Sequence, residues 1–164
     1  MLTTDFNSYF WIVIDIALYD KLTNYCAYSE RCEHDVRLKC SKLNIETEKA
    51  AYYIAKLKEE GFVNDARYAS SFVRSKSKRG WGSLKIKNAL SRKKIPKEFI
   101  QKSLEEIDVN LQKEKTLDLA QKKWKNIKAK TNSERKTKLI RFLIGKGYSF
   151  DLANAISKQV SDKI

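Results

Sequence analysis

The stretch Ser83–Ile107, SLKIKNALSRKKIPKEFIQKSLEEI, shows how this chain is expected to fold. It contains two sets of apolar residues spaced as on one face of a helix: Ile86, Ala89 and Leu90, then Ile100, Leu104 and Ile107. Pro96 lies between the sets and is expected at the first position of the second helix, where its missing N–H costs nothing. The stretch therefore predicts two amphipathic helices with a short connection.

The same pattern occurs three times along the chain. When Ile45, Ile95 and Tyr148 are placed in register, four further apolar columns coincide without gaps: Val36, Ile86 and Leu139; Cys40, Leu90 and Leu143; Ala50, Ile100 and Ala153; Leu57, Ile107 and Val160. A further helix is expected before each pair, at roughly 10–29, 65–78 and 111–128. The prediction is an all-α protein of three tandem three-helix repeats forming an elongated, curved molecule.

The predicted repeats span 17–62, 63–109 and 110–164, and the last two are basic. Residues 1–16 form an N-terminal segment of uncertain structure, because the run Tyr9–Ile14 fits a strand and a buried helix equally well. Further along, Asn64 or Asp65, Thr131 with Glu134, and Ser149 are expected to cap helices.

Composition supports a single helical array. Leu, Ile, Val and Phe make up about 26% of the 164 residues, which is enough for a core. One Pro and five Gly are too few for the tight turns of a sandwich or barrel. A unit of three short helices buries little surface alone, so neighbouring units are expected to share core.

Charge is distributed unevenly. Residues 1–60 have a net charge of −2, residues 61–110 of +7 and residues 111–164 of +9. An acidic first third beside a basic remainder indicates a protein contact at one end and a polyanion at the other. The alternative is that basic charge merely keeps a small helical protein soluble.

Cysteine usage and hydropathy indicate the compartment. Three Cys do not make a disulfide framework and are typical of reduced thiols in a cytosol. The apolar stretch Tyr9–Tyr19 is too short to cross a bilayer, and no basic residue precedes it as in a secretory signal. A cytoplasmic protein without a membrane partner is predicted.

The residues needed for catalysis are scarce, so no enzyme activity, cofactor or metal is expected. One His is present, and no metal-binding, nucleophile-elbow or phosphate-loop motif occurs. Cys26, Cys32, His34 and Cys40 lack the close ligand pair of a structural zinc site. Cys26 and Cys40 are predicted in the core and His34 on the surface.

The strongest local signal is a basic run in residues 74–94. Nine basic side chains and no acidic one occur there: Arg74, Lys76, Lys78, Arg79, Lys85, Lys87, Arg92, Lys93 and Lys94. Trp81 lies among them on a connection flanked by glycines, where it could stack on a base or a partner. The set predicts a surface that contacts phosphates. A solvated face with Trp81 in the core is the alternative.

A second basic set belongs to the third repeat. It comprises Lys122, Lys123, Lys125, Lys128, Lys130, Arg135, Lys136, Lys138 and Arg141. Of these, Lys136, Lys138 and Arg141 join the candidate binding residues, whereas Trp124 is expected in the core. A solvated face is again the alternative.

Motifs in the central repeat bear a family resemblance. Gly61–Ala69, GFVNDARYA, is followed by Phe72-Val73-Arg74 and then by Lys78–Gly82, KRGWG. These resemble the Gly-aromatic-aliphatic-Asp-Asp-x-Arg-aromatic-Ala and basic-basic-Gly-aromatic-Gly motifs of the RecX family, bacterial regulators of the RecA recombinase. The resemblance covers about residues 20–160.

The outer repeats fit this family less closely. Arg141-Phe142-Leu143 and Gly147-Tyr148-Ser149 are similar to its last-repeat motifs, and Ser29-Glu30-Arg31 matches the first repeat loosely. There are three departures from the pattern. Asn64 replaces an Asp, Ser83 replaces a Pro, and Cys32 stands where a Ser cap is usual, which predicts a weaker helix start.

The resemblance implies a function as well as a fold. A member of this family binds along RecA filaments on single-stranded DNA and mainly inhibits the recombinase, ATPase and coprotease activities of RecA in DNA repair and the SOS response. The implied partners are the RecA filament and single-stranded DNA, with double-stranded DNA as a second option, and the protein is expected to be a monomer. The alternative is a helical protein that binds DNA or RNA directly.

Overall fold

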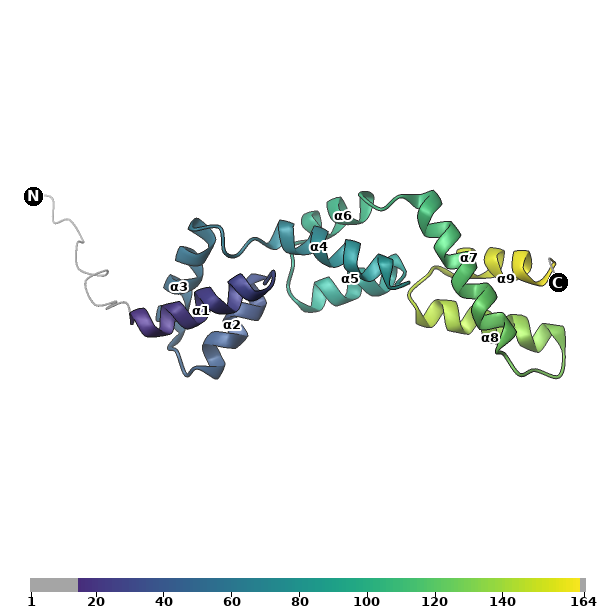
Figure 1. Ribbon diagram of the computed structural model, residues 1–164, viewed down its shortest axis with the longest axis horizontal. Coiled ribbons are helices and arrows are strands. Elements are labelled where there is room, and N and C mark those ends of the chain that lie inside the picture. The colour runs from purple at the N-terminus through teal and green to yellow at the C-terminus, as the bar shows by residue number, and fades with distance from the viewer. Residues whose placement is uncertain (1–14, 163–164) are drawn as a thin grey trace, which may run out of the picture. The chain divides into compact units, whose positions relative to one another are not determined.

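The computed structural model describes residues 15–162, and within that range the chain has nine helices and no strand (Figure 1). The helices are α1 (Ile16–Tyr28), α2 (Glu33–Lys42), α3 (Thr47–Glu59), α4 (Asp65–Lys78), α5 (Ser83–Arg92), α6 (Lys97–Glu105), α7 (Val109–Lys125), α8 (Asn132–Gly145) and α9 (Phe150–Ser161). The predicted all-α fold is confirmed. The stretch 9–14 lies outside the described residues.

Helix starts differ from prediction at two places. The first helix, expected from about residue 10, begins at Ile16, because the Asp15 backbone is extended and its carboxylate caps the Leu18 N–H at 3.0 Å. Pro96 is the N-cap of α6 rather than its first residue, since its ψ of 140° is not helical.

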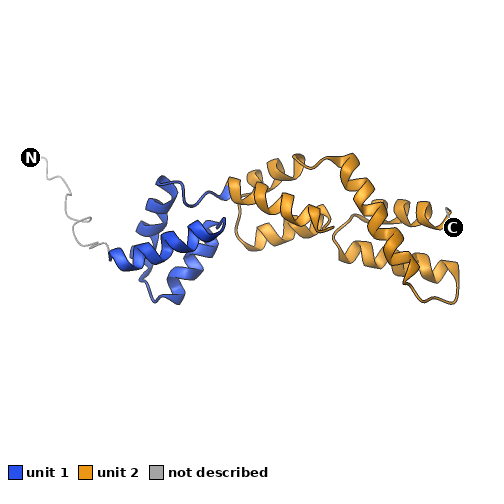
Figure 2. Ribbon diagram, viewed as in Figure 1, with its two compact units in different colours: residues 1–65 blue, residues 66–164 orange. Residues whose placement is uncertain are grey.

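The described chain forms two compact units, which meet in sequence between Asp65 and Ala66 (Figure 2). Unit 1 contains α1–α3, and unit 2 contains the rest of α4 and helices α5–α9. Packing divides the chain into compact units at this one point, between residues 65 and 66. The predicted repeat boundaries at 62/63 and 109/110 therefore stay a prediction.

The repeat register is visible in the core. All three residues of the columns headed by Val36, Cys40 and Ala50 are buried, whereas Ile107 is half-buried and differs from its buried counterparts Leu57 and Val160. Apolar burial of this kind is the main stabilising contribution to a small helical unit.

Each repeat also joins its last two helices in the same way. Asn44, Lys94 and Gly147 occupy equivalent positions, and all three have a positive φ. The residue after each one donates its N–H to a carbonyl near the helix end: Ile45 to Cys40 at 3.0 Å, Ile95 to Leu90 at 3.2 Å and Tyr148 to Leu143 at 3.2 Å. This is the six-to-one bond of a helix ending in a left-handed residue.

The core of unit 1 is formed by α1–α3 and includes the three cysteines. Cys26, Cys32 and Cys40 are all buried, which confirms the prediction for Cys26 and Cys40; His34 is only half-buried. Burial raises the pKa of the Cys26 thiol to about 11. The thiols therefore serve as small apolar side chains.

The start of α2 is capped from a distance. The Cys32 side chain makes no capping bond, as its chemistry suggests, but the Asp65 carboxylate accepts the Glu33 N–H at 2.9 Å. Cys32 thus leaves the helix start without a side-chain cap of its own, as predicted, and a residue 32 positions away supplies an acceptor for the first helical N–H.

Two capping predictions hold in unit 2. Ser149 caps the Leu152 N–H at 3.3 Å, and Thr131 caps the Glu134 N–H at 3.1 Å. The Glu134 carboxylate reaches one residue further than a capping box requires and accepts the Lys130 N–H at 2.8 Å. No helix in the described residues is both long and apolar enough to cross a membrane.

Candidate interaction surface

The basic residues of the central run point to different places in unit 2. Arg74 and Lys78 line one hollow with the α6–α7 connection and α7, and Lys87 lines another between α5 and α6. Lys85 and Arg92 line a third, between α5 and α8. The nine side chains therefore form no single surface. Helical spacing is a signal that could have shown part of this, because positions 74 and 78 share a face that position 76 does not.

Trp81 organises the first basic group, which we call the Trp81 cluster: Trp81, Phe72, Lys76 and Lys85. The Trp81 ring is half-buried and stands edge-on to Phe72, with 6.5 Å between ring centroids. The Nζ atoms of Lys76 and Lys85 lie 5.1 and 4.6 Å from the Trp81 centroid. Trp81 is thus neither free on its loop nor in the core, and two ammonium groups flank its ring.

The loop that carries Trp81 is held by α8. The N–H of Gly82 donates to the carbonyl of Lys146 at 2.8 Å, and the N–H of Leu84 donates to the carbonyl of Gly147 at 3.1 Å. The first amides of α5 therefore pair with the last carbonyls around α8, where donors and acceptors would otherwise lack helical partners.

Glycine is required at this joint for steric reasons. A Cβ added to Gly82 would lie 2.2 Å from the Gly147 carbonyl oxygen, and one added to Gly147 would lie 2.3 Å from the Lys85 Cβ. Such distances are far inside van der Waals contact. The two Gly-containing loops therefore interlock, and this fixes the Trp81 loop against the end of α8.

The hollow beside this joint continues the basic surface. It has a volume of about 350 Å³ and is lined by Leu84, Lys85, Asn88, Arg92, Ile144, Gly145, Gly147 and Tyr148. The Lys85 Nζ lies 3.5 Å from the Gly145 carbonyl oxygen, so Lys85 belongs both to this hollow and to the Trp81 cluster. One cation therefore links the two features.

A second lysine–aromatic group, the Phe142 cluster, comprises Phe142, Lys123 and Lys146. The two Nζ atoms lie 5.1 and 5.5 Å from the Phe142 ring centroid. Phe142 also lines a shallow hollow of about 540 Å³ with no acidic side chain: Lys123, Asn126, Ile127, Lys128, Lys138 and Arg141. This hollow is suited to an anion.

Other candidate residues have structural contacts of their own. Lys138 pairs with Glu134 at 2.6 Å and donates to the Lys128 carbonyl at 2.9 Å. Together with the Lys130 N–H, this ammonium holds the pKa of the Glu134 carboxyl below its usual range. Lys93 lies over the Tyr68 ring, 5.6 Å from its centroid.

The remaining candidates have simpler surroundings. Arg79 and Arg141 are exposed, Lys136 is half-buried, and Lys94 holds a left-handed conformation. Trp124 is buried as predicted, beneath the Arg135 guanidinium at 5.5 Å. In residues 15–162 no group of His, Cys, Asp and Glu is arranged to hold a metal.

Comparison with known proteins identifies the same architecture. Residues 64–104 match the model of the RecX second three-helix domain, and residues 112–156 match that of the third. The crystal structure of RecX from Lactobacillus salivarius superposes with a TM-score of 0.74 at 29% identity, covering 89% of this chain and 95% of that one. The chain is thus an all-α repeat protein of three-helix domains.

Sequence relatives place it more narrowly. The regulatory protein RecX of Clostridium botulinum (strain Alaska E43 / Type E3) is 38% identical over 79% of this chain. The regulatory protein RecX of Finegoldia magna is 30% identical over 85% of this chain and 69% of its own length. The chain belongs to the RecX family of regulatory proteins, and it spans 61% of the length of the Clostridium botulinum relative.

Proposed function

We propose that this protein binds RecA filaments formed on single-stranded DNA and restrains the activities of RecA. Membership of a family of regulatory proteins supports a regulatory role. The observation that carries the proposal is the pair of lysine–aromatic clusters in unit 2, around Trp81 and Phe142. Ammonium groups beside aromatic faces suit both phosphates and unstacked bases.

The interlocked loops hold the Trp81 cluster in place before it binds a partner. Because backbone bonds hold Gly82 and Leu84 against the end of α8, the Trp81 loop loses little conformational freedom when it binds. A surface that is ordered in advance binds with a smaller entropic cost. We infer that unit 2 supplies the contacts with nucleic acid and with acidic patches of RecA, and that acidic unit 1 faces protein.

The protein is further proposed to act in the cytoplasm as a monomer without an enzymatic activity of its own. Three buried cysteines with no disulfide between them are consistent with a reducing compartment. Light scattering on the purified chain tests the monomeric state; a mass of twice 19.1 kDa would contradict it.

The decisive experiment measures DNA-dependent ATP hydrolysis by RecA as this protein is added. Inhibition at far less than one copy per RecA protomer supports action on filaments. Inhibition only when the protein is sufficient to coat the DNA would instead indicate a direct nucleic-acid binder.

The variant Lys76→Glu with Lys85→Glu tests the Trp81 cluster. Both substitutions keep the Cβ atoms and reverse the charge beside Trp81, so inhibition should weaken about tenfold or more. The matched control, Lys102→Glu with Lys113→Glu, makes the same charge change at exposed positions outside the clusters. Equal loss in both variants, with normal helicity, would show that net charge rather than this cluster matters.

A further inference from the structure

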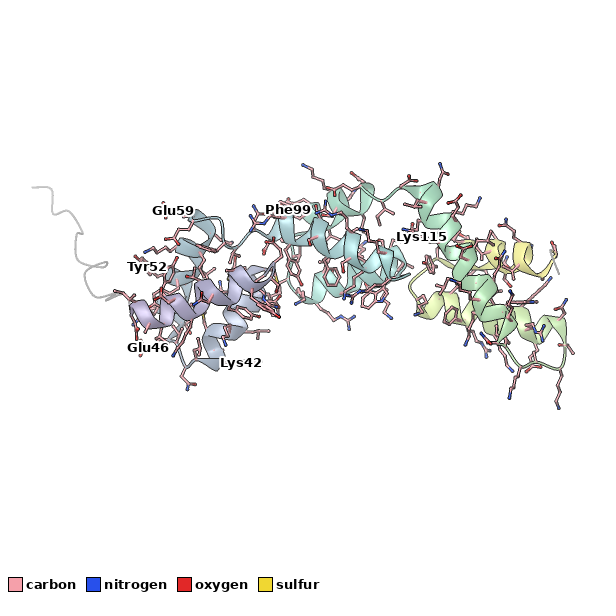
Figure 3. The ribbon with its side chains drawn as sticks, viewed as in Figure 1. Lys42, Glu46, Tyr52, Glu59, Phe99 and Lys115 are labelled. Carbon is pink, nitrogen blue, oxygen red and sulfur yellow. The ribbon has the colours of Figure 1, made fainter. Side chains whose placement is uncertain are left out.

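A hollow between α4 and the start of α7, distinct from the Trp81 and Phe142 clusters, has the properties of a binding site. Its volume is about 200 Å³, and its lining residues are Val73, Arg74, Ser77, Lys78, Glu106, Ile107, Asp108, Leu111, Gln112 and Lys115. All of them belong to unit 2, and Lys115 is labelled on α7 in Figure 3. Ligand sites for metabolites usually exceed about 300 Å³, so this one suits a single side chain.

Two buried polar atoms of the lining have no partner. The Ser77 Oγ and the Gln112 Nε2 are both buried and make no hydrogen bond. Such groups lose their hydration on burial without regaining a bond, and they are uncommon in folded proteins. A ligand with a carbonyl or carboxylate oxygen would accept from both, and would recover the lost bonds.

The charges around the hollow also favour an acceptor. The carboxylates are already engaged, since Glu106 accepts from the Ser70 hydroxyl at 3.2 Å and Asp108 caps the start of α7. Within the described residues, the three cations Arg74, Lys78 and Lys115 have neither a hydrogen bond nor an ion pair. Cations without a local partner attract an anionic group from outside.

The apolar part of the lining indicates what accompanies the anion. Val73 is buried, Ile107 is half-buried and Leu111 is 46% exposed, so an apolar wall opens to the surface. A free phosphate or a nucleic-acid backbone would leave that wall in water. An acidic peptide with one large apolar side chain would cover it and place its carboxylates at the cationic rim.

We propose that the hollow between α4 and α7 docks an acidic segment of a partner protein, with one apolar side chain seated against Val73, Ile107 and Leu111. Flanking carboxylates pair with Arg74, Lys78 and Lys115, and peptide oxygens accept hydrogen bonds from Ser77 and Gln112. This docking site agrees with the proposed contacts of unit 2 with acidic protein patches but does not depend on them, because peptide binding at the hollow can hold or fail whether or not the chain restrains RecA.

The test uses the full chain and a fluorescein-labelled peptide, Asp-Asp-Phe-Asp-Asp, in fluorescence anisotropy at physiological ionic strength. Saturable binding is expected. Changing the four Asp to Asn, or Phe to Ser, should each weaken it about tenfold or more. Absence of binding by the wild-type chain, or equal binding of the Asn peptide, would overturn the proposal.

Variants locate the site. Arg74→Glu with Lys78→Glu should raise Kd about tenfold or more, whereas Lys102→Glu with Lys158→Glu, of equal charge change at exposed positions that do not line the hollow, should raise it less than about twofold. The neutral double variant Arg74→Gln with Lys78→Gln should also weaken peptide binding. It is used in place of the charge-reversed variant if the charge-reversed variant does not fold. Similar losses in the control and the site variants would contradict this location.

The apolar contact has its own readout. Leu111→Ser should weaken the Phe peptide about threefold and leave the Ser peptide unchanged, because only the former covers Leu111. A labelled oligothymidylate tests the alternative that the hollow binds nucleic acid rather than a peptide. If it binds with the same dependence on Arg74 and Lys78 and displaces the peptide, while Leu111→Ser has no effect on either, the hollow is a nucleic-acid contact and the peptide proposal is wrong.

Discussion

Unit 1 and unit 2 share one helical pattern but differ in the balance of basic and acidic side chains. Residues 1–65 contain 8 basic and 11 acidic side chains, whereas residues 66–164 contain 26 basic and 9 acidic ones. In unit 1, Glu33 pairs with both Arg37 and Lys58, and the Tyr19 hydroxyl donates to Glu60. Unit 1 also places cations over aromatic rings, because Arg31, Lys39, Lys49 and Lys56 lie over tyrosine side chains. The two units therefore differ in charge balance rather than in the kind of contact that their cations make.

In unit 2, many cations lie over aromatic rings or along hollows. Lys76 and Lys85 flank Trp81, Lys123 and Lys146 flank Phe142, and neither cluster contains a carboxylate. Apolar columns at helical spacing therefore build the same fold under opposite surface charge. The core determines the architecture, and the surface determines which partner each unit can meet.

The comparison is tested most strongly at the Gly82–Gly147 joint of unit 2. Gly82→Ala places a Cβ against backbone, so unit 2 should lose about 3 kcal/mol or more. Gly145→Ala is the matched control, because a Cβ there meets nothing within 4 Å and the residue ends α8. The control should leave unfolding within about 1 kcal/mol of wild type.

Thermal unfolding followed by tryptophan fluorescence measures this change. Trp81 and Trp124 lie in unit 2, and the third tryptophan, Trp11, is replaced by Phe in every variant. Unfolding of Gly82→Ala at the wild-type temperature would show that the loops do not interlock as described.

A change confined to unit 1 should be smaller. Asp65→Ala removes the acceptor for the Glu33 N–H at the start of α2, and the expected cost is about 1 to 2 kcal/mol. Asp20→Ala makes the same charge change at an exposed position within α1 and should cost less than about 0.5 kcal/mol. Hydrogen exchange of the α2 amides distinguishes the two; equal exchange would remove Asp65 as the cap.

The connection between α5 and α6, where Lys94 has a left-handed backbone conformation, can be stabilised by substitution. Lys94 has a φ of 58°, which glycine adopts without the Cβ penalty, so Lys94→Gly should stabilise unit 2 by about 0.5 to 1 kcal/mol. Lys87→Gly removes the same charge from the middle of α5 and should destabilise by about 1 kcal/mol. Chemical denaturation measures the unfolding free energy of both variants. A change in the same direction for Lys94→Gly and Lys87→Gly would contradict the prediction.

The smallest effect is a pH dependence in unit 1. Hydrogen bonds from Lys58 and Arg37 hold the pKa of the Glu33 carboxyl below its ordinary value of 4.5. Because the folded-state pKa is the lower one, this stabilisation is present above pH 4.5 and is lost as pH falls through the folded pKa. The pairs are partly exposed, so the loss is about 0.5 kcal/mol.

Glu33→Gln isolates this contribution. The difference in unfolding free energy between wild type and the variant should shrink below pH 4.5. A difference that stays constant from neutral pH to pH 3 would show that the pairs do not depend on ionisation.

Much of the fold follows from local pattern. The columns headed by Val36, Cys40 and Ala50 are buried in all three repeats, and Ser149 and Thr131 cap the helices that they precede. Helical periodicity and capping act over a few residues, so the order of residues is sufficient to predict them.

The candidate surface was only partly predictable. The basic run in residues 74–94 is apparent from composition, but five of its nine side chains are divided among three hollows, because each hollow is completed by a different helix. Position along the chain cannot show which of α6, α7 or α8 lies beside a given lysine.

The sequence by itself therefore determined an all-α repeat fold, the burial of Cys26 and Cys40 and a basic C-terminal part, because these depend on spacing and composition. Only the tertiary structure decided that Asp65 caps α2, that Gly82 fits against Gly147 and that two lysines flank Trp81. The contacts of Asp65 and of Gly82 join residues far apart in the chain, 32 positions at Asp65 and Glu33, so their close approach depends on packing rather than on local pattern. Lys76 and Lys85 are near Trp81 in sequence, but the turn between α4 and α5 decides that both ammonium groups lie against its ring.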